Sequence, residues 1–402
     1  MSWFDFIRLF RMIFGKKDPD LDKIQQLGLL AVKIGQVFAL RIDFLGPEKC
    51  RTLSNLYSRQ NRVSPSQLDL LLALNGGSTF LANFEDFDSV PFAAASVGQV
   101  HRARLLTGEY VAVKFVKQDF APAFNRDIAR AERIFKVARF VYPRLSGVAN
   151  PLAVLHDLRI MTNRELDLRN EVAGQDVLET IYRESRSQFN LAQLRFPVIH
   201  RELSTKTVLV KDYVPGNTFD ELLTQGRLSY QSLLDLFHIH GFYMFVKGTF
   251  HGDIHPGNVI LNDGAITFID TSFIGHVTDQ VRINLFHFFD ALSQFDYPRA
   301  AHFLHAMSSV ALNQEAYVAF RDNFVALYAD FTDTPVGKVS LTQKMMHTIK
   351  LGVLSGMAFE EGMFDIIKSL MYMDGMVIRA NPGAVLLKDL RPFIEEFKEQ
   401  IA

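Results

Sequence analysis

The run from His251 to Asn258, His-Gly-Asp-Ile-His-Pro-Gly-Asn, constrains the fold of this chain more than any other stretch. Its Pro-Gly pair predicts a turn. Residues 259–269 then predict two short apolar strands joined by an Asn-Asp-Gly turn. Such a hairpin returns Asp270 to the neighbourhood of Asn258. We therefore expect the carboxylates of Asp253 and Asp270 and the amide of Asn258 to share one site.

These three side chains are the groups that transfer of a phosphoryl group from ATP requires. One carboxylate must lie beside the attacking oxygen, and oxygen ligands must hold Mg²⁺ on the phosphates. The spacing of Asp253 and Asn258 is that of the protein-kinase catalytic loop. We assign Asp253 as the catalytic residue that orients or deprotonates the acceptor, and Asn258 and Asp270 as metal ligands. His251 and His255 are separated by turn-forming residues, so we interpret them as structural histidines and not as a zinc pair.

Composition bounds the class of protein. The 402 residues are 48% hydrophobic and 22% charged, a normal globular balance, and the length suggests two or three packing units. A net charge of −1 gives no indication of a nucleic-acid partner. The single cysteine, Cys50, excludes an internal disulfide and fits a reducing compartment. No cleavable signal and no bilayer-spanning run is visible, so we expect a cytoplasmic protein, with peripheral contact on the inner face of a membrane.

Residues 1–17 predict a short amphipathic helix. Its apolar face consists of side chains at helical spacing: Trp3, Phe6, Ile7, Phe10, Ile13 and Phe14. Arg8 and Arg11 lie elsewhere on the helix, and Lys16 and Lys17 follow it. An aromatic face with basic flanks suits an anionic membrane surface, but it also fits a helix docked on its own protein. The prediction taken forward is that the side chains of Trp3, Phe6, Ile7, Phe10 and Phe14 bind membrane.

A second group of motifs precedes the stretch from His251 to Asn258, which we call the catalytic run. A candidate phosphate loop leads into a hairpin, and the strand from Tyr110 to Val116 contains Val-Ala-Val-Lys. This order predicts that Lys114 contacts the α- and β-phosphates. Alanines replace the usual glycines of the loop and restrict φ, so the nucleotide should be held differently. The loop residues assigned to nucleotide binding are Phe92, Ala93, Ala94, Ala95, Ser96, Val97, Gly98, Gln99 and Val100.

A kinase site also needs a helical glutamate paired with the strand lysine. Asn163 predicts the cap of a helix whose first turns carry Glu165, Asp167 and Glu171. We choose Glu171 as the partner of Lys114, with Glu165 as the second choice. After Asp270 the chain reads Thr-Ser where protein kinases have Phe-Gly, which predicts that this segment does not flip in and out.

Taken together, these motifs resemble the UbiB family of atypical kinases, which support ubiquinone and other prenyl-lipid metabolism. The hallmarks present are K-x-G-Q at Lys33 to Gln36, the alanine-rich loop, E-x-D at Glu165 to Asp167, the catalytic loop and the metal aspartate. The resemblance implies that Lys33, Gln36, Glu165 and Asp167 belong to the catalytic machinery, with Lys33 paired to one of the two acids. It also implies ATP or ADP with Mg²⁺, and lipid- or quinone-pathway proteins as partners.

The expected fold is α+β and bilobal, like that of protein kinases. We expect an amphipathic segment (1–17), a helical extension carrying K-x-G-Q (18–83), an N-lobe with a helical insertion (84–214) and a helical C-lobe (215–402). Two other functions stay open on the sequence. One is a small-molecule kinase like the aminoglycoside phosphotransferases or choline kinases, which share the catalytic run. The other is a nucleotide-binding pseudokinase that acts through a partner, which the lost glycine after Asp270 favours.

Overall fold

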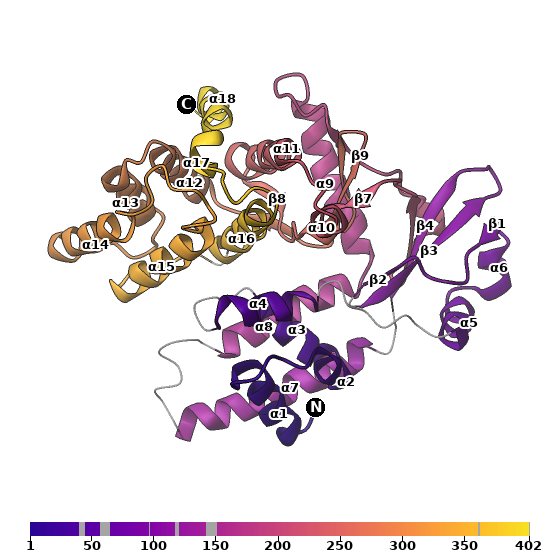
Figure 1. Ribbon diagram of the computed structural model, residues 1–402. Coiled ribbons are helices and arrows are strands. Elements are labelled where there is room, and N and C mark those ends of the chain that lie inside the picture. Colours follow the sequence, from indigo (N-terminus) through magenta and orange to yellow (C-terminus); the bar gives the residue numbers. More distant parts are fainter. Residues whose placement is uncertain are drawn as a thin grey trace. The chain divides into compact units, whose positions relative to one another are not determined.

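The computed structural model describes residues 1–39, 45–56, 65–95, 97–116, 120–141, 151–360 and 362–401, and Ser96 of the candidate phosphate loop lies outside them. The described chain forms two compact units (Figure 1). The first contains Met1–Ala173 and Pro197–Val214, and the second contains Gly174–Phe196 and Pro215–Ala402. Both units combine helices with mainly antiparallel sheet, which confirms the α+β class.

The first unit contains a sheet with the strand order β1-β3-β4-β6, to which β2 adds by pairing with β3. Its strands are β1 (Phe84–Phe87), β2 (Ala93–Ala95), β3 (Gly98–Leu105), β4 (Tyr110–Val116) and β6 (Val208–Asp212). Alternate residues of a strand point to opposite faces. Val111, Val113 and Phe115 therefore join one apolar cluster, which also contains Phe80 and Phe84. Lys114 lies between Val113 and Phe115 in the same strand and therefore points to the opposite face of the sheet.

Helices make up the rest of the first unit. They are α1 (Trp3–Phe14), α2 (Leu21–Gln26), α3 (Leu29–Ala39), α4 (Pro47–Ser54), α5 (Pro65–Leu74), α6 (Gly77–Leu81), α7 (Phe120–Val141), α8 (Pro151–Glu165) and the 3₁₀ turn η2 (Arg201–Leu203). Side chains from α1, α2, α3, α4, α7 and α8 share one buried cluster, and Figure 1 shows α1, α3, α7 and α8 grouped together. This cluster is a helical core separate from the sheet.

The amphipathic N-terminal helix packs on its own protein. Helix α1 begins at a capping box formed by Ser2 and Asp5. Phe6 and Ile13 are buried in the helical core together with Leu9. The prediction that the whole face binds membrane is therefore wrong for Phe6, because burial in the helical core already removes that ring from water.

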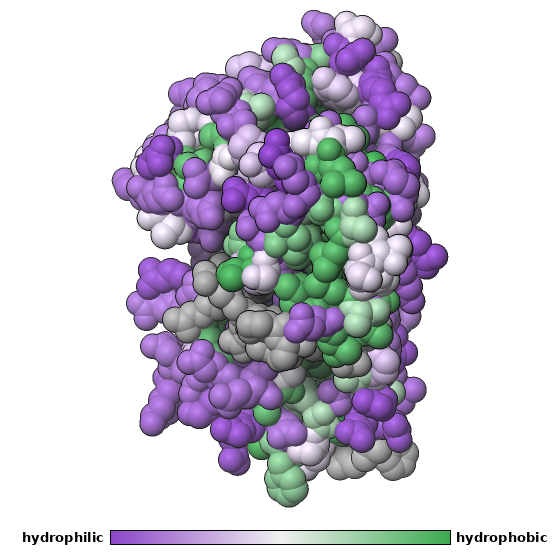
Figure 2. Space-filling model, turned by 90° about the vertical axis from the view of Figure 1, so that its right-hand side faces the viewer, coloured by the Kyte–Doolittle hydropathy of each residue, from purple (hydrophilic) through white to green (hydrophobic). Residues whose placement is uncertain are grey.

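Several large apolar side chains of the first unit remain on the surface. On α1, Trp3 and Phe14 are exposed and Phe4 is 78% exposed. Others lie around the sheet, at Val90, Phe92, Leu106, Tyr110 and Val198. Figure 2 shows hydrophobic side chains gathered in one area of the face seen there. Exposed apolar area of this kind is typical of surfaces that meet another apolar surface.

The second unit is mainly helical. Its helices are α9 (Arg169–Ser185, which begins in the first unit), α10 (Phe219–Thr224), α11 (Tyr230–Gly241), α12 (Asp279–Ser293), α13 (Tyr297–Ala306), α14 (Gln314–Leu327), α15 (Leu341–Leu354), α16 (Gly362–Ala380), α17 (Leu386–Asp389) and α18 (Arg391–Ile401). A four-stranded sheet has the order β5 (Leu194–Arg195), β10 (Ala265–Phe268), β9 (Val259–Asn262), β7 (Asn217–Thr218). A two-stranded sheet pairs β8 (Thr249–His251) with β11 (Ile274–His276).

The buried segment before the catalytic run is not one continuous helix. The apolar run from Leu233 to Phe250 predicts a single helix, whereas α11 ends at Gly241 and a π-helical turn, η3 (Phe242–Val246), follows. Gly248 then adopts a left-handed φ of 64°, which ends the helical path and starts β8. The segment is nonetheless buried, as its apolar composition predicts. Among the described residues, no helix has the length and apolar character needed to cross a bilayer.

Candidate active site

Backbone and histidine contacts shape the catalytic run. It lies between β8 and β9 and ends in the 3₁₀ turn η4 (Pro256–Asn258). Nδ1 of His251 accepts the backbone N–H of Asp253 at 3.1 Å, and Nδ1 of His255 accepts that of Gly257 at 3.1 Å. Burial lowers the pKa of His251 to about 4, which keeps the ring neutral and Nδ1 available as an acceptor. Both histidines therefore act as structural groups.

The hairpin brings Asp270 beside Asn258 as expected. Strands β9 and β10 pair in register, with Val259 opposite Phe268. At the turn, Asp263 and Gly264 have φ of 47° and 80°, the left-handed pair that a tight hairpin requires. The N–H of Ile269 then donates to the carbonyl of Asn258 at 3.0 Å. This bond holds the residue before Asp270 against Asn258.

The donor atoms at this place fit Mg²⁺. The Asn258 amide nitrogen donates to the carbonyl of Asp253 at 3.0 Å, which directs the amide oxygen to the ligand side. Asp270 Oδ1 accepts from the N–H and the hydroxyl of Ser272, at 3.2 and 2.7 Å. Within the described part of the chain, no three His, Cys, Asp or Glu side chains gather to hold a metal by themselves. One carboxylate and one amide, completed by phosphate oxygens and water, is the kind of set that Mg²⁺ uses.

The segment after Asp270 is held tightly against α9. A Cβ built on Gly174 would lie 1.9 Å from the carbonyl oxygen of Thr271, so only glycine fits there. Thr271 itself is buried. The close contact leaves this segment little room to move, in line with the expectation that it does not flip.

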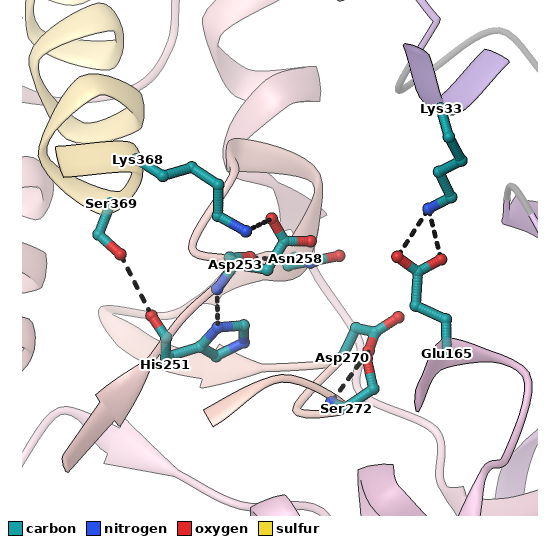
Figure 3. Close-up of polar contacts among 9 residues, drawn as sticks. All are labelled: Lys33, Glu165, His251, Asp253, Asn258, Asp270, Ser272, Lys368 and Ser369. Atoms are coloured by element: carbon teal, nitrogen blue, oxygen red, sulfur yellow. Dashed lines mark hydrogen bonds and ion pairs between the residues drawn. The ribbon is translucent and has the colours of Figure 1, made fainter. Parts of the chain in front are cut away.

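A lysine from a distant helix lies beside the carboxylate of Asp253. Lys368 of α16 is 4% exposed, and its Nζ lies 3.2 Å from Oδ1 of Asp253. The next residue, Ser369, donates to the carbonyl of His251 at 3.5 Å. Figure 3 shows both side chains reaching from one turn of α16 to the catalytic run. No site residue after Asp270 was predicted from the sequence; the available signal was the Lys-Ser pair inside the apolar stretch from Ile366 to Met373.

The strand lysine and the helical glutamate pair in the first unit. Nζ of Lys114 lies 2.6 Å from Oε2 of Glu171, as chosen from the sequence. Lys211 of β6 was not foreseen, and its Nζ lies 2.6 Å from the other oxygen of Glu171. All three side chains are buried, and together they carry a formal charge of +1. A lysine inside the apolar strand Val-Leu-Val-Lys-Asp was the signal for this third member.

The K-x-G-Q and E-x-D residues meet through one ion pair. Lys33 Nζ lies 2.6 and 2.5 Å from the two oxygens of Glu165 (Figure 3). Asp167 instead binds the guanidinium of Arg169, with Nη2 to Oδ2 at 2.6 Å. The amide nitrogen of Gln36 donates to the carbonyl of Leu56 at 3.1 Å and so ties α3 to the end of α4. Of the two acids that the resemblance offered, Glu165 is thus the partner of Lys33.

The helix predicted to start at Asn163 begins later. Asn163 lies inside α8, and its amide exchanges hydrogen bonds with that of Asn125. The chain leaves the helical path after Glu165, because Leu166 and Leu168 turn into a buried cluster. Helix α9 then starts at Arg169 with Glu171 in its first turn. Burial of the two leucines outweighs the cap preference of Asn163.

The alanine-rich loop forms a hairpin on the sheet. Ala93, Ala94 and Ala95 pair with Val100, Gln99 and Gly98 of β3. A Cβ on Gly98 would lie 2.4 Å from the carbonyl oxygen of Phe115, so glycine lets β3 and β4 approach there. In this loop Val97, Gly98 and Gln99 are buried, whereas Phe92 is exposed.

The side chain of Gln99 is buried inside the sheet. Its amide nitrogen lies 2.8 Å from Nε2 of His101, inside the sheet. Burial lowers the pKa of His101, which favours the neutral ring in this contact. A nucleotide at this hairpin would therefore meet the backbone of residue 99 and not its side chain.

Comparison with known proteins gives one consistent family. The model of the ABC1 atypical kinase-like domain matches residues 55–304. A Tolumonas auensis protein named probable protein kinase UbiB is 26% identical over 387 residues, covering 93% of this chain and 69% of that protein. The chloroplastic Arabidopsis thaliana protein ACTIVITY OF BC1 COMPLEX KINASE 8 is 30% identical over 293 residues, covering 68% of this chain and 36% of that protein.

Among solved structures, Mycobacterium tuberculosis Rv3197, in complex with erythromycin, has a similar fold. The TM-score is 0.54 with 18% identity, and the match covers 95% of this chain and 92% of that chain. At this identity the likeness concerns the fold alone.

Proposed function

Because the chain belongs to the ABC1 atypical kinase-like family, as its motifs predict, we propose that it binds Mg-ATP and acts as a phosphotransferase or ATPase. The observation that carries this proposal is the arrangement of Asp253, Asn258 and Asp270. Within a single unit, the Asn258 side chain donates to the carbonyl of Asp253, and the N–H of Ile269, the residue before Asp270, donates to the carbonyl of Asn258. A polar loop that merely closed a hairpin would not need two acids and an amide at this place.

Each residue has a proposed role. Asp253 orients the acceptor hydroxyl or water and receives its proton. Asn258 and Asp270 hold Mg²⁺ by their side-chain oxygens, and Mg²⁺ supplies charge neutralisation on the phosphates when bound. Lys114, fixed by Glu171, binds the α- and β-phosphates. The Lys33–Glu165 pair and Gln36 belong to the same machinery, as the resemblance implies, and the alanine-rich hairpin is a nucleotide contact.

The proposed setting is ubiquinone or other prenyl-lipid metabolism at a membrane surface, with a lipid- or quinone-pathway protein as partner. Similarity to a protein named UbiB supports it. The exposed Trp3 and Phe4 of α1 offer apolar contact to a membrane. A nucleotide-binding pseudokinase acting through a partner is the second candidate. It is favoured by the Asp-Thr-Ser segment locked against Gly174.

Calorimetric titration of the full chain with Mg-ATP and Mg-ADP tests the proposal. We expect Asp270→Asn to weaken Mg-nucleotide affinity at least tenfold, since it removes a metal-binding charge. Asp263→Asn on the exposed turn of the same hairpin is the matched control and should bind normally. An unchanged affinity in a folded Asp270→Asn protein refutes the metal assignment. ATP hydrolysis, measured with and without anionic liposomes, separates the enzyme from the pseudokinase.

A further inference from the structure

Lys368 is an unusual lysine. It lies on α16 among the buried residues Ile366, Ile367 and Leu370, and it is itself buried. A buried ammonium group is costly unless charge and hydrogen bonds compensate it. Its nitrogen forms an ion pair with Asp253, at 3.2 Å, and the ring of Phe273 lies 5.0 Å from it. The cation is thus placed at the carboxylate assigned to the acceptor.

The hydrogen-bonding capacity of Lys368 is not used up. An ammonium group has three N–H donors. In the described part of the chain, the Lys368 nitrogen has no hydrogen-bond partner of good geometry. Asp253 Oδ1 lies 3.2 Å away, close enough for an ion pair. Asp253 retains some exposure, with 26% of its side-chain surface accessible. A buried cation with spare donors, next to a carboxylate on the solvent side, is arranged to bind a further anion.

Resting on the proposed function, we propose that Lys368 is a catalytic residue that binds the transferred γ-phosphoryl group while it fixes the Asp253 carboxylate. The acceptor oxygen must lie about 2.8 Å from Asp253 to give up its proton. Lys368 lies 3.2 Å from that carboxylate and is therefore close to the place where the acceptor oxygen would meet the phosphoryl group. Positive charge placed where negative charge develops lowers the barrier to transfer.

The reaction step balances with the groups present. The acceptor oxygen forms a bond to the γ-phosphorus, and the bond from that phosphorus to the β–γ bridging oxygen breaks. The electron pair of the broken bond leaves with ADP, and the acceptor proton passes to Asp253. Lys368 exchanges no atom with the substrate.

A lysine that only anchors α16 to the catalytic run would behave differently from one that binds phosphate. An anchor would change stability without distinguishing ATP from ADP. A γ-phosphoryl ligand must distinguish them, because ADP lacks the group that it contacts. The ratio of ATP to ADP affinity is therefore the decisive measurement, and it does not depend on turnover.

The test uses the full chain with Mg²⁺ and compares ATP and ADP affinities by calorimetry. We expect Lys368→Met to lower the ATP-to-ADP affinity ratio at least tenfold, and Lys368→Arg to retain most of it. Lys344→Met is the matched control, since Lys344 is also a buried lysine of the second unit, paired with Asp330 on the α14–α15 side. It should leave the ratio unchanged. A ratio within twofold of wild type in folded Lys368→Met overturns the proposal.

A second comparison tests the proposal even if the Lys368→Met variant does not fold. Asp253→Asn combined with Lys368→Met removes both charges, so neither is left buried and unpaired. The double variant should show a lower ATP-to-ADP affinity ratio than Asp253→Asn alone, and an equal ratio contradicts the role of Lys368. If wild type binds ATP without turning it over, the enzyme proposal and the catalytic role of Lys368 both fail, while this ratio still decides whether Lys368 binds the γ-phosphoryl group. If wild type binds neither nucleotide, both proposals fall.

Discussion

Gly174 of α9 lies directly against the carbonyl oxygen of Thr271, the residue after the proposed metal ligand Asp270. This contact joins a helix to the Asp-Thr-Ser segment without any side chain at position 174. Any side chain at position 174 would collide with Thr271, so the segment can occupy this position only while residue 174 is glycine.

Gly174→Ala should therefore destabilise the protein. Alanine in place of a glycine inside a helix normally stabilises by about 1 kcal/mol. Here the overlap with Thr271 should reverse the sign and cost about 1–3 kcal/mol. Urea unfolding measures the change. Gly375→Ala on α16 is the control, because a Cβ there meets nothing within 4 Å, and it should be neutral or stabilising. A stabilised Gly174→Ala would mean that the segment moves aside freely.

Asp253→Asn should reduce turnover far more than binding. Orientation of the acceptor acts mainly in the transition state, and loss of a general base typically lowers rates about 10²–10⁴-fold. Mg-ATP affinity should stay within about threefold, since Asn258 and Asp270 remain. Steady-state hydrolysis and calorimetry give the two numbers. Parallel losses of rate and affinity would assign Asp253 to nucleotide binding instead.

The buried ring of His251 should make stability fall in mild acid. Its pKa is about 4 in the folded protein, against 6.5 ordinarily, so the unfolded chain takes up the proton first. The contribution of the neutral ring is complete above pH 6.5 and is lost as the pH falls toward 4. At pH 5 the loss is about 2 kcal/mol relative to neutral pH. His251→Gln should flatten this part of the profile in urea unfolding, whereas the exposed His302→Gln should not.

The Lys33–Glu165 pair should couple α3 to α8 energetically. Lys33→Met leaves a carboxylate that is only 19% exposed, so we expect a cost of about 1–3 kcal/mol, reduced by the remaining solvent contact. Adding Glu165→Gln should recover part of the loss. A double-mutant cycle by urea unfolding measures the coupling. Asp167→Asn is the control because its partner Arg169 is largely exposed. Additive losses would show that the pair contributes no coupling.

Neighbouring phenylalanines of α1 should separate core packing from membrane contact. Phe6→Ala removes a buried ring and should cost about 3 kcal/mol or more. Phe4→Ala should leave stability within about 0.5 kcal/mol, but weaken sedimentation with anionic liposomes, especially together with Trp3→Ala. Deletion of residues 1–17 should lower the melting temperature. Unchanged liposome binding in the Trp3/Phe4 variant would remove α1 from any membrane contact.

Local signals were sufficient for the catalytic run. The Asn-Asp-Gly turn predicts the hairpin because few residues adopt two consecutive left-handed conformations, and the hairpin alone brings Asp270 to Asn258. The Lys114–Glu171 pair followed from the order of elements typical of kinases. These features depend on short stretches of chain, so the local residue pattern is enough to predict them.

Features formed between distant elements were missed. Lys368 and Lys211 look like ordinary lysines until tertiary structure places them against Asp253 and Glu171. The pattern of α1 likewise shows that it has an apolar face but not what covers it. Phe6 and Ile13 meet other helices of the same unit, and only the folded chain identifies that partner.

The contacts of α16 also have a consequence for the order in which the protein matures during synthesis. Residues 251–253 leave the ribosome long before Lys368 and Ser369, the two side chains of α16 that hold them. Since chains emerge N-terminus first, the catalytic run must wait for most of the second unit to be translated before it acquires its final contacts. A nascent or truncated chain that stops before α16 would contain every residue of the catalytic run without the helix that holds it.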